Sequence, residues 1–143
     1  MMIVDLNILI YAVNRDAPDH HAARRFWEEC LSSDRPIGLA WTVILGFLRV
    51  TTHPRVMPKP ISAFAAMKIV DGWMKQPQVR LLEPTERHWA ILRELLAPFG
   101  MAGNVTSDAH LAALAIEHGA ELVSADHDFA RFPRLRFTHP FNR

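Results

Sequence analysis

Short apolar runs alternate with longer amphipathic segments along this chain of 143 residues. Each run has the length of a buried strand, and the runs occupy residues 2–4, 37–40, 79–82, 121–124 and 135–138. Apolar residues in the longer segments recur at the spacing of one helix face. These segments occupy residues 7–13, 18–31, 41–50, 63–74, 89–99 and 108–118, and a further helical turn spans residues 129–132. Strands that alternate with helices are typical of an α/β domain, so we predict a central, mostly parallel sheet.

Length and composition predict one domain that covers residues 1–143. A chain near 150 residues buries roughly 68–70% of its unfolded surface, which is enough for a core without covalent cross-links. Hydrophobic residues make up 50% of the chain and charged residues 22%, which excludes a disordered protein. Cys30 is the single cysteine, which excludes an internal disulfide and a cysteine-rich zinc site, so we expect a cytoplasmic protein.

The charge balance gives no sign of a particular partner. The formal net charge is +1, from 16 Lys and Arg against 15 Asp and Glu, so a nucleic-acid partner would need a local basic patch. A membrane span requires ~18 consecutive apolar residues, and the sequence contains no such stretch. The first residues lack the basic region of a signal peptide, and Asp5 interrupts their apolar run. We therefore expect no membrane association.

Four aspartates flank the predicted strands. Asp5 follows the first strand, Asp126 and Asp128 follow the fourth, and Asp108 begins the helix before the fourth strand. Ligands of such sheets bind beyond the carboxyl ends of the strands, so we expect these carboxylates to converge at one edge. Two unit charges about 4 Å apart repel by roughly 4 kcal/mol at an effective dielectric near 20, so the group needs protonation or a cation. Carboxylate oxygens favour Mg²⁺ or Mn²⁺, which can polarise a phosphodiester and deliver hydroxide to it.

Each of these acids also has an ordinary structural explanation. Asp5 can cap the helix that follows it, and Asp108 suits the positive end of a helix dipole. Asp126 and Asp128 form an Asp-x-Asp loop of the kind found in turns. Their joint placement in the order of an α/β fold is what favours a metal site.

Three segments resemble motifs of a known family. They are VDLNILIYA at residues 4–12, DAHLAALA at 108–115 and SADHDFARF at 124–132, and in that order they resemble the PIN domain. More narrowly, they resemble the VapC-type toxins of bacterial toxin–antitoxin pairs. The resemblance implies a single PIN-like domain with a three-layer α/β/α fold. It also implies a Mg²⁺- or Mn²⁺-dependent endoribonuclease, the toxin of a type II module, which forms a homodimer and is neutralised by a cognate VapB-type antitoxin.

The resemblance also implies roles for individual residues. By motif position, the metal-binding and catalytic acids are Asp5, Asp108 and Asp126. Asp128 would be an auxiliary or capping residue, and Asn7 and Asn104 would support the site. An antitoxin helix would lie in an apolar groove between the first helices and the helix over residues 63–74.

The chain departs from the family pattern at Gly46, where the family usually has an acid in the helix over residues 41–50. The sequence has no glutamate between Glu29 and Glu83, so the four-acid site is reduced. Our hypothesis is a single well-held metal ion, with Asp128 or water partly filling the gap at Gly46. The alternative is impaired activity.

Two other functions compete with RNA cleavage. Gly46 favours a catalytically weakened PIN-like module that binds RNA or an antitoxin, although such a module has no reason to keep mutually repelling acids. A phosphoacceptor receiver or a haloacid-dehalogenase-like phosphatase also uses a strand-end aspartate. Those proteins need a lysine late in the chain, whereas the lysines here are Lys59, Lys68 and Lys75. RNA cleavage is the better interpretation.

Basic residues supply candidate phosphate contacts. Arg49, in the same helix as Gly46, is the most interesting of them, and a second group near the C-terminus comprises Arg131, Arg134, Arg136 and Arg143. The alternative for these arginines is a solvated basic surface.

Histidine and tryptophan side chains are interpreted as structural. We expect His20, His21, His110 and His118 at the surface, and His127, between two candidate acids, is the exception worth testing. The four tryptophans fit apolar helix faces, which indicates core or dimer packing. Cys30 lies on a predicted buried face and is interpreted as an inert thiol.

Overall fold

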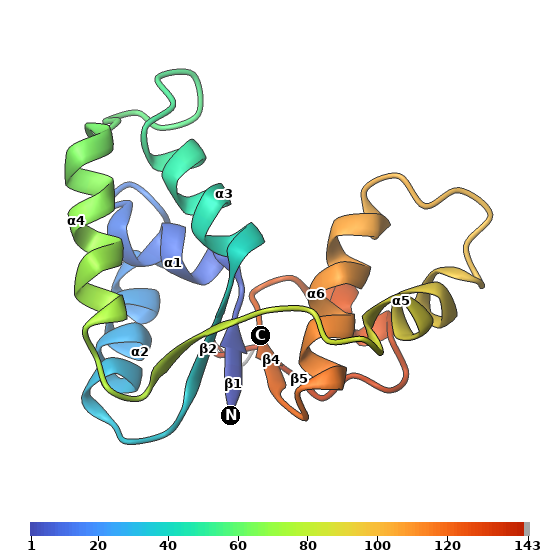
Figure 1. Ribbon diagram of the computed structural model, residues 1–143. Helices are drawn as coiled ribbons and strands as arrows, with labels where there is room; N and C mark the ends of the chain where they lie inside the picture. Colours follow the sequence, from blue (N-terminus) through green and yellow to red (C-terminus); the bar gives the residue numbers. More distant parts are fainter. Residues whose placement is uncertain (142–143) are drawn as a thin grey trace.

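The computed structural model describes residues 1–141, within which five strands form one sheet (Figure 1). The strands are β1 (Met2–Val4), β2 (Ile37–Ala40), β3 (Val79–Leu82), β4 (Glu121–Val123) and β5 (Phe137–Thr138). Their order is β3-β2-β1-β4-β5, and every neighbouring pair is parallel, which confirms the predicted α/β sheet. Val4 pairs with Val123, so the carboxyl ends of β1 and β4 lie side by side at the centre of the sheet.

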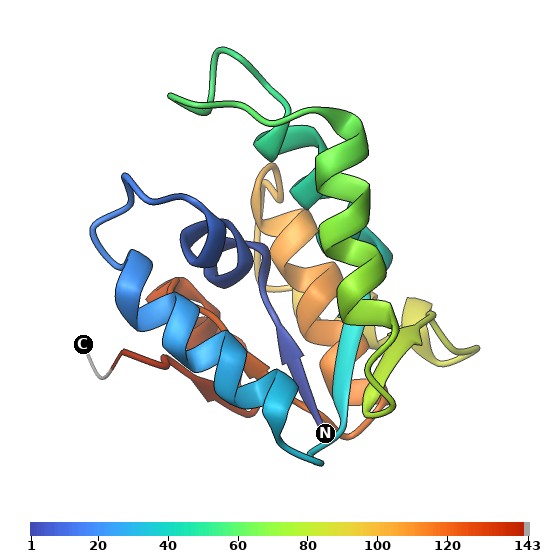
Figure 2. The same ribbon diagram turned by 90° about the vertical axis from the view of Figure 1, so that its left-hand side faces the viewer.

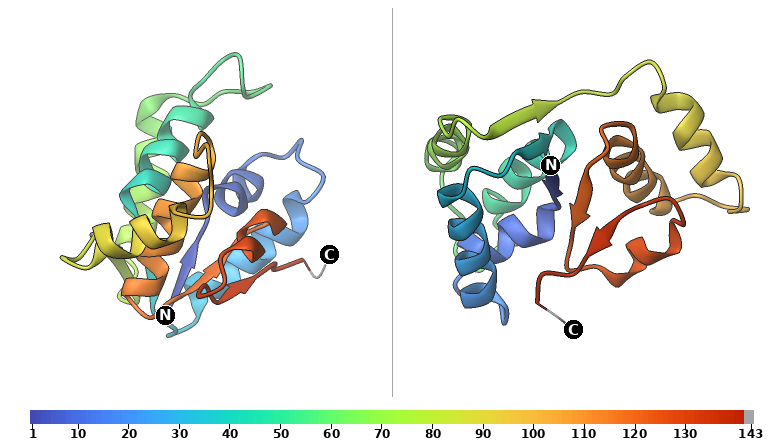
Figure 3. Two further views of the ribbon diagram at one scale, coloured as in Figure 1. Left: turned by 90° about the vertical axis from the view of Figure 1, so that its right-hand side faces the viewer. Right: turned by 90° about the horizontal axis from the view of Figure 1, so that it is seen from below.

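Helices cover both faces of this sheet. Within residues 1–141 they are α1 (Leu6–Val13), α2 (His20–Ser32), α3 (Trp41–Thr51), α4 (Ala63–Met74), α5 (His88–Leu96), α6 (Val105–Glu117) and the 3₁₀ helix η1 (His127–Arg131). Helices α1 to α4 lie on one side and α5 and α6 on the other, as two perpendicular views show (Figures 1 and 3). The structure therefore has the three layers of an α/β/α fold. The segment between α3 and α4 projects beyond both helices (Figure 2).

The core lies on both faces of the sheet, between the central strands and the helices that pack on them. Ile3 and Phe47 are fully buried there. Trp27 and Trp73 meet edge to face with ring centroids 5.6 Å apart, and Phe47 packs on Trp73 at 4.7 Å. The predicted core packing is thus confirmed for these two tryptophans, whereas Trp41 is exposed.

Helices α5 and α6 differ from their predicted limits. Helix α5 ends at Leu96 rather than at residue 99, because the proline at 98 has no N–H with which to continue the helical hydrogen bonds. It buries Ile91 and leaves Trp89 68% exposed, so of the two predicted environments, core or dimer packing, Trp89 does not have the first. Helix α6 begins at Val105, ahead of the predicted start, and is followed as predicted by Gly119, whose φ of +62° suits a residue without a side chain.

Two smaller predictions have opposite outcomes. His20 is buried rather than on the surface, and its Nδ1 lies 2.8 Å from the Tyr11 carbonyl oxygen. Cys30 is buried as expected, and burial raises the pKa of its thiol to about 11, so the thiol stays protonated at neutral pH. Over residues 1–141, no helix combines the length and hydropathy that crossing a membrane requires.

Candidate active site

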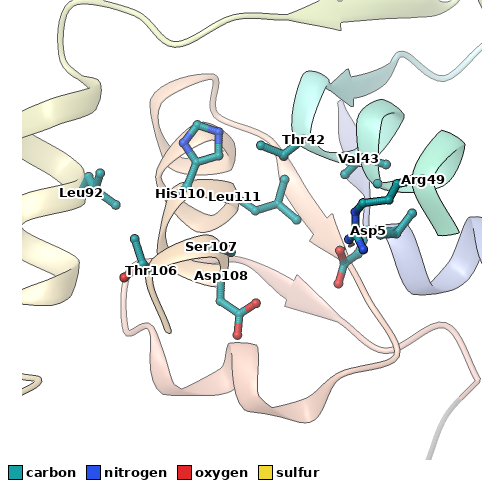
Figure 4. A pocket seen from close by; sticks show the side chains of 12 residues that line it. Asp5, Thr42, Val43, Arg49, Leu92, Thr106, Ser107, Asp108, His110 and Leu111 are labelled. Atoms are coloured by element: carbon teal, nitrogen blue, oxygen red, sulfur yellow. Dashed lines mark hydrogen bonds between the residues drawn. The ribbon is translucent and has the colours of Figure 1, made fainter. Parts of the chain in front are cut away.

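A cavity of about 540 Å³ opens where β1, α3 and α6 come together (Figure 4). Its walls come from both sides of the sheet and include Asp5, Leu6, Gly46, Arg49, Asp108 and His110. Two of the predicted acids, Asp5 and Asp108, therefore line one cavity although 102 residues separate them in the sequence. The placement expected at the carboxyl edge of the sheet is present for this pair.

Asp5 joins β1 to α1 and is bonded on both carboxylate oxygens. Its Oδ1 accepts the Leu6 N–H at 2.7 Å, which caps α1, and its Oδ2 accepts the Ser124 hydroxyl at 2.7 Å. Burial raises the pKa of Asp5, the bonds from Ser124 and Leu6 oppose the rise, and the charge of Asp126 adds to it, with a net increase. The capping explanation of Asp5 is thus correct, yet the carboxylate still borders the cavity.

Ser124 connects the two central strand ends. Its hydroxyl oxygen accepts the Asn7 Nδ2–H at 3.1 Å and the Asp126 N–H at 3.0 Å while donating to Asp5. One donor and two acceptors exhaust a hydroxyl, so Ser124 has a single arrangement. The Asn7 Oδ1 accepts the Ala125 N–H at 3.2 Å, which ties α1 to the loop after β4. Asn7 therefore braces the loop beside Asp5, and Ser124 is a member of this hydrogen-bond network that sequence reasoning missed.

Asp126 and Asp128 lie in the loop that leads into η1. Asp126 caps η1, with its Oδ1 accepting the Asp128 N–H at 2.9 Å, and the Asp128 side chain is 72% exposed. The turn chemistry considered for this pair is thus present. Asp126 nonetheless acts on the site electrostatically, because its charge raises the pKa of both Asp5 and Asp108.

Asp108 is held by an arginine from η1. The Arg131 Nη2 donates to the Asp108 Oδ2 at 2.7 Å, and its Nη1 lies 3.9 Å from the Asp128 Oδ2. The Phe99 and Phe132 rings flank the guanidinium at 5.8 and 5.3 Å. Burial raises the pKa of Asp108, Arg131 lowers it, and the charges of the other three acids raise it again, with a net increase. Arg131 therefore offsets only part of the negative charge of the site.

The other residues singled out in the sequence have different environments. Arg134 pairs with Glu94 at 2.8 Å, and Arg136 donates to the Gly119 carbonyl oxygen. Arg143 lies outside the described residues. Asn104 is exposed at the start of α6 and makes no capping bond among the described residues. His127 is exposed, and its ring stacks on His139 with centroids 4.4 Å apart.

The donors of the site suit a hard cation. Within residues 1–141, no three side chains among His, Cys, Asp and Glu come close enough together to hold a metal ion as they stand. Mg²⁺ usually needs only one or two carboxylates and keeps several water ligands. Asp5 and Asp108 provide two carboxylates on one cavity, and both have raised pKa values that a cation would counteract. The residues present therefore fit Mg²⁺ or Mn²⁺.

Comparison with known proteins places the chain in a family. The family model of the PIN domain matches residues 2–135. This chain belongs to the PIN domain family. Ribonuclease VapC43 of Mycobacterium tuberculosis is 42% identical to this PIN domain over 142 residues, which cover 99% of this chain and 97% of that protein. Ribonuclease VapC37 of the same organism is 41% identical over 140 residues, which cover 98% and 97%.

Solved structures agree on the fold of this PIN domain. VapBC2 from Rickettsia felis, bound to a DNA fragment from its promoter, matches with a TM-score of 0.69 at 18% identity and covers 96% of each chain. VapC20 from Mycobacterium tuberculosis, described as a sarcin–ricin loop cleaving toxin, matches with a TM-score of 0.65 at 19% identity, over 95% of this chain and 99% of that one. The three-layer fold implied by the sequence motifs is confirmed.

The position of the absent acid is filled in this PIN domain by a neighbour. A Cβ built on Gly46 would lie 2.6 Å from the Leu6 Cδ2. Leu6 thus occupies the space into which a longer side chain at position 46 would extend. Arg49, one turn further along α3, is exposed and lines the same cavity.

A buried polar chain beside the cavity was also missed. Glu117, near the end of α6, has a fully buried side chain whose Oε2 bonds the His88 Nδ1 of α5. The His88 Nε2 lies 2.9 Å from the His110 Nδ1, and His110 lines the cavity. His110, predicted at the surface, is half-buried. A glutamate spaced by seven residues from His110, on the helix face of the buried Leu114, was the sequence signal that could have revealed this chain.

Proposed function

We propose that this PIN-domain protein is a divalent-metal-dependent endoribonuclease and the toxin of a type II toxin–antitoxin module. The observation that carries the proposal is the shared cavity of Asp5 and Asp108, two desolvated carboxyl groups with raised pKa values. The relatives named as VapC ribonucleases indicate RNA as the substrate class.

Each site residue has a separate role in this proposal. Asp5 and Asp108 hold the cation, Asp126 is the third acid, and Asp128 is auxiliary. When bound, Mg²⁺ or Mn²⁺ supplies polarisation of the phosphodiester and a hydroxide nucleophile. Ser124 and Asn7 fix the orientation of the Asp5 carboxylate through the bonds described above. Arg49 binds a phosphate of the RNA, and Asn104 supports the site from the start of α6.

The proposed partners follow from the relatives and from one apolar surface. The solved structure from Rickettsia felis is that of VapBC2, so we propose a VapB-type antitoxin for this chain, together with a homodimer in the cytoplasm. Leu48, Phe64, Met67 and Val70 line a depression of about 250 Å³ between α3 and α4. We propose this depression as the docking site of an antitoxin helix. It lies between α3 and α4, whereas the sequence analysis placed the groove between the first helices and α4.

The test is cleavage of a mixed small-RNA pool, including transfer RNA, by purified protein free of antitoxin. The reactions contain Mg²⁺, Mn²⁺ or a chelator, and Asp5→Asn is the control variant. Asparagine is a good capping residue, so this variant keeps the start of α1 while removing one charge from the site. We expect discrete fragments with either metal, and intact RNA with chelator or with the variant.

The opposite result separates the two functions weighed above. RNA that stays intact with both metals, although the folded protein binds it, would contradict the nuclease and favour a module that binds without cleaving. Fragments that persist with chelator would contradict metal dependence.

A further inference from the structure

A second pocket, of about 280 Å³, lies where the end of α5 meets the end of η1. Its apolar walls comprise Leu95, Pro98, Phe99, Phe132 and Pro133. Pockets that hold drug-sized ligands have volumes of roughly 300–1,000 Å³, so this smaller pocket suits a single compact ring system. The proposed function gives this pocket no role.

Arg131 connects this pocket to the cavity that contains the acids. It lines the pocket, and its Nη2 donates to the Oδ2 of Asp108, which lines the cavity. Its guanidinium lies 5.8 Å from the ring centroid of Phe99 and 5.3 Å from that of Phe132, which is the range of cation–π contacts. The pocket therefore begins one side chain away from a proposed metal ligand.

The charged groups that line the pocket already have partners. Arg131 is paired with Asp108, and Arg134 is paired with Glu94 at 2.8 Å. A phosphate or a carboxylate in the pocket would have to compete with an acid for either arginine. A neutral ligand with apolar faces does not face this competition, so the pocket favours such a ligand.

A nucleobase is a neutral ring system with apolar faces. Bases of single-stranded RNA stack on aromatic rings and on guanidinium planes, whatever the identity of the base. Each base is joined through its ribose to a phosphate, so a pocket next to a phosphate site can receive the base of an adjacent nucleotide. Phe132 is buried and Phe99 is half-buried, so Phe99 is the more accessible of the two rings.

We propose that this pocket binds one base of the RNA substrate beside the phosphate that is cleaved, by stacking on Phe99 and on the Arg131 guanidinium. Phe99 is then a residue that binds substrate outside the metal site. This inference rests on the proposed function for the identity of the substrate as RNA, but it concerns binding and not cleavage.

The test uses mononucleotides, which contain no phosphodiester bond and bind without being cleaved. The probes are AMP, CMP, GMP and UMP, and ribose 5-phosphate is the matched probe without a base. Two-dimensional NMR of the whole chain follows each titration, with chelator present. Stacking of one base corresponds to about tenfold in affinity, so at least one nucleotide should bind about tenfold more tightly than ribose 5-phosphate. Its largest chemical-shift changes should fall on the amides of Leu95, Phe99 and Phe132.

Two variants locate the stacking surface. Phe99→Leu keeps an apolar side chain but removes the ring, so it should reduce the affinity for nucleotides to that for ribose 5-phosphate. Trp89→Leu is the matched control, because Trp89 is an exposed aromatic residue of α5 that is not among the residues lining the pocket. This control should keep the tenfold preference.

Two results would overturn the proposal. One is equal affinity of wild type for all five probes, which would leave an apolar side chain of a protein partner as the occupant of the pocket. The other is a preference for nucleotides that Phe99→Leu leaves unchanged. A protein that binds nucleotides in this pocket but cleaves no RNA would support this inference while contradicting the nuclease. RNA cleavage without any preference for nucleotides would do the reverse.

Discussion

Arg131 bonds one of the carboxylates that we propose as metal ligands. Its Nη2 holds the Asp108 Oδ2 at 2.7 Å, with the two side chains 29% and 30% exposed. A cation that binds Asp108 must displace or weaken this bond. Replacing Arg131 by glutamine should therefore strengthen metal binding. The replacement also removes a positive charge whose role could otherwise have been assigned to RNA binding alone.

The structure sets the size of the effect. Charge-assisted hydrogen bonds contribute about 1.5–3 kcal/mol and exposed ion pairs about 0–1 kcal/mol, so about 1 kcal/mol suits this partly exposed pair. Tenfold in affinity is about 1.4 kcal/mol, so Arg131→Gln should bind Mn²⁺ about fivefold more tightly.

Electron paramagnetic resonance of free Mn²⁺ measures this affinity directly, and calorimetry repeats it with Mg²⁺. Arg134→Gln is the matched control, because Arg134 makes a bond of 2.8 Å to Glu94 and touches no proposed ligand. Its affinity should equal that of wild type. An Arg131→Gln variant that binds Mn²⁺ as wild type does, or more weakly, would refute the competition between Arg131 and the cation.

Two further predictions concern the acids and the absent acid. Burial gives Asp5 a raised folded-state pKa, so stability without metal falls as pH rises from about 3.9, the usual pKa of an unfolded aspartate, through the folded value. Asp5→Asn should therefore raise the thermal unfolding midpoint of the metal-free protein at pH 7, and the gain should vanish near pH 3; an unchanged midpoint at pH 7 would contradict this. Gly46→Glu should tighten Mg²⁺ binding by calorimetry while overpacking against Leu6 reduces stability by about 1 kcal/mol. The matched Gly46→Gln variant should lose stability without gaining affinity, and equal affinities for the two variants would show that the gap does not matter.

The fold was predictable because its elements carry local patterns. The apolar strand at Met2–Val4 and the apolar faces of the helices give the order of an α/β sheet without any tertiary information. The buried face of α5 was less predictable, because its apolar residues lie on more than one face. The strip containing Trp89 is as apolar as the strip containing Ile91, and only packing against α6 decides which is buried.

The shared placement of Asp5 and Asp108 was predictable for the same reason, since one follows a strand and the other lies in the first turn of a helix. Their partners were not. The Asp108–Arg131 bond joins α6 to η1, and the His88–Glu117 bond joins α5 to α6, so both depend on how helices pack. Ser124 is a small polar residue at the end of a buried strand, and nothing in its sequence context distinguishes a connector from a solvent-facing serine.

The central claim is that three aspartates from distant segments form one RNA-cleaving site. The most direct measurement is the single-turnover rate of RNA cleavage with Mg²⁺ by Asp5→Asn, Asp108→Asn and Asp126→Asn, each checked for folding by circular dichroism. Asp34→Asn is the control, because Asp34 is exposed before β2, at the opposite edge of the sheet. Removing one electrostatic contact to a transition state typically lowers the rate about 10²–10³-fold, so we predict losses of that size for the three site variants and none for Asp34→Asn. A site variant that cleaves at the wild-type rate would contradict the claim.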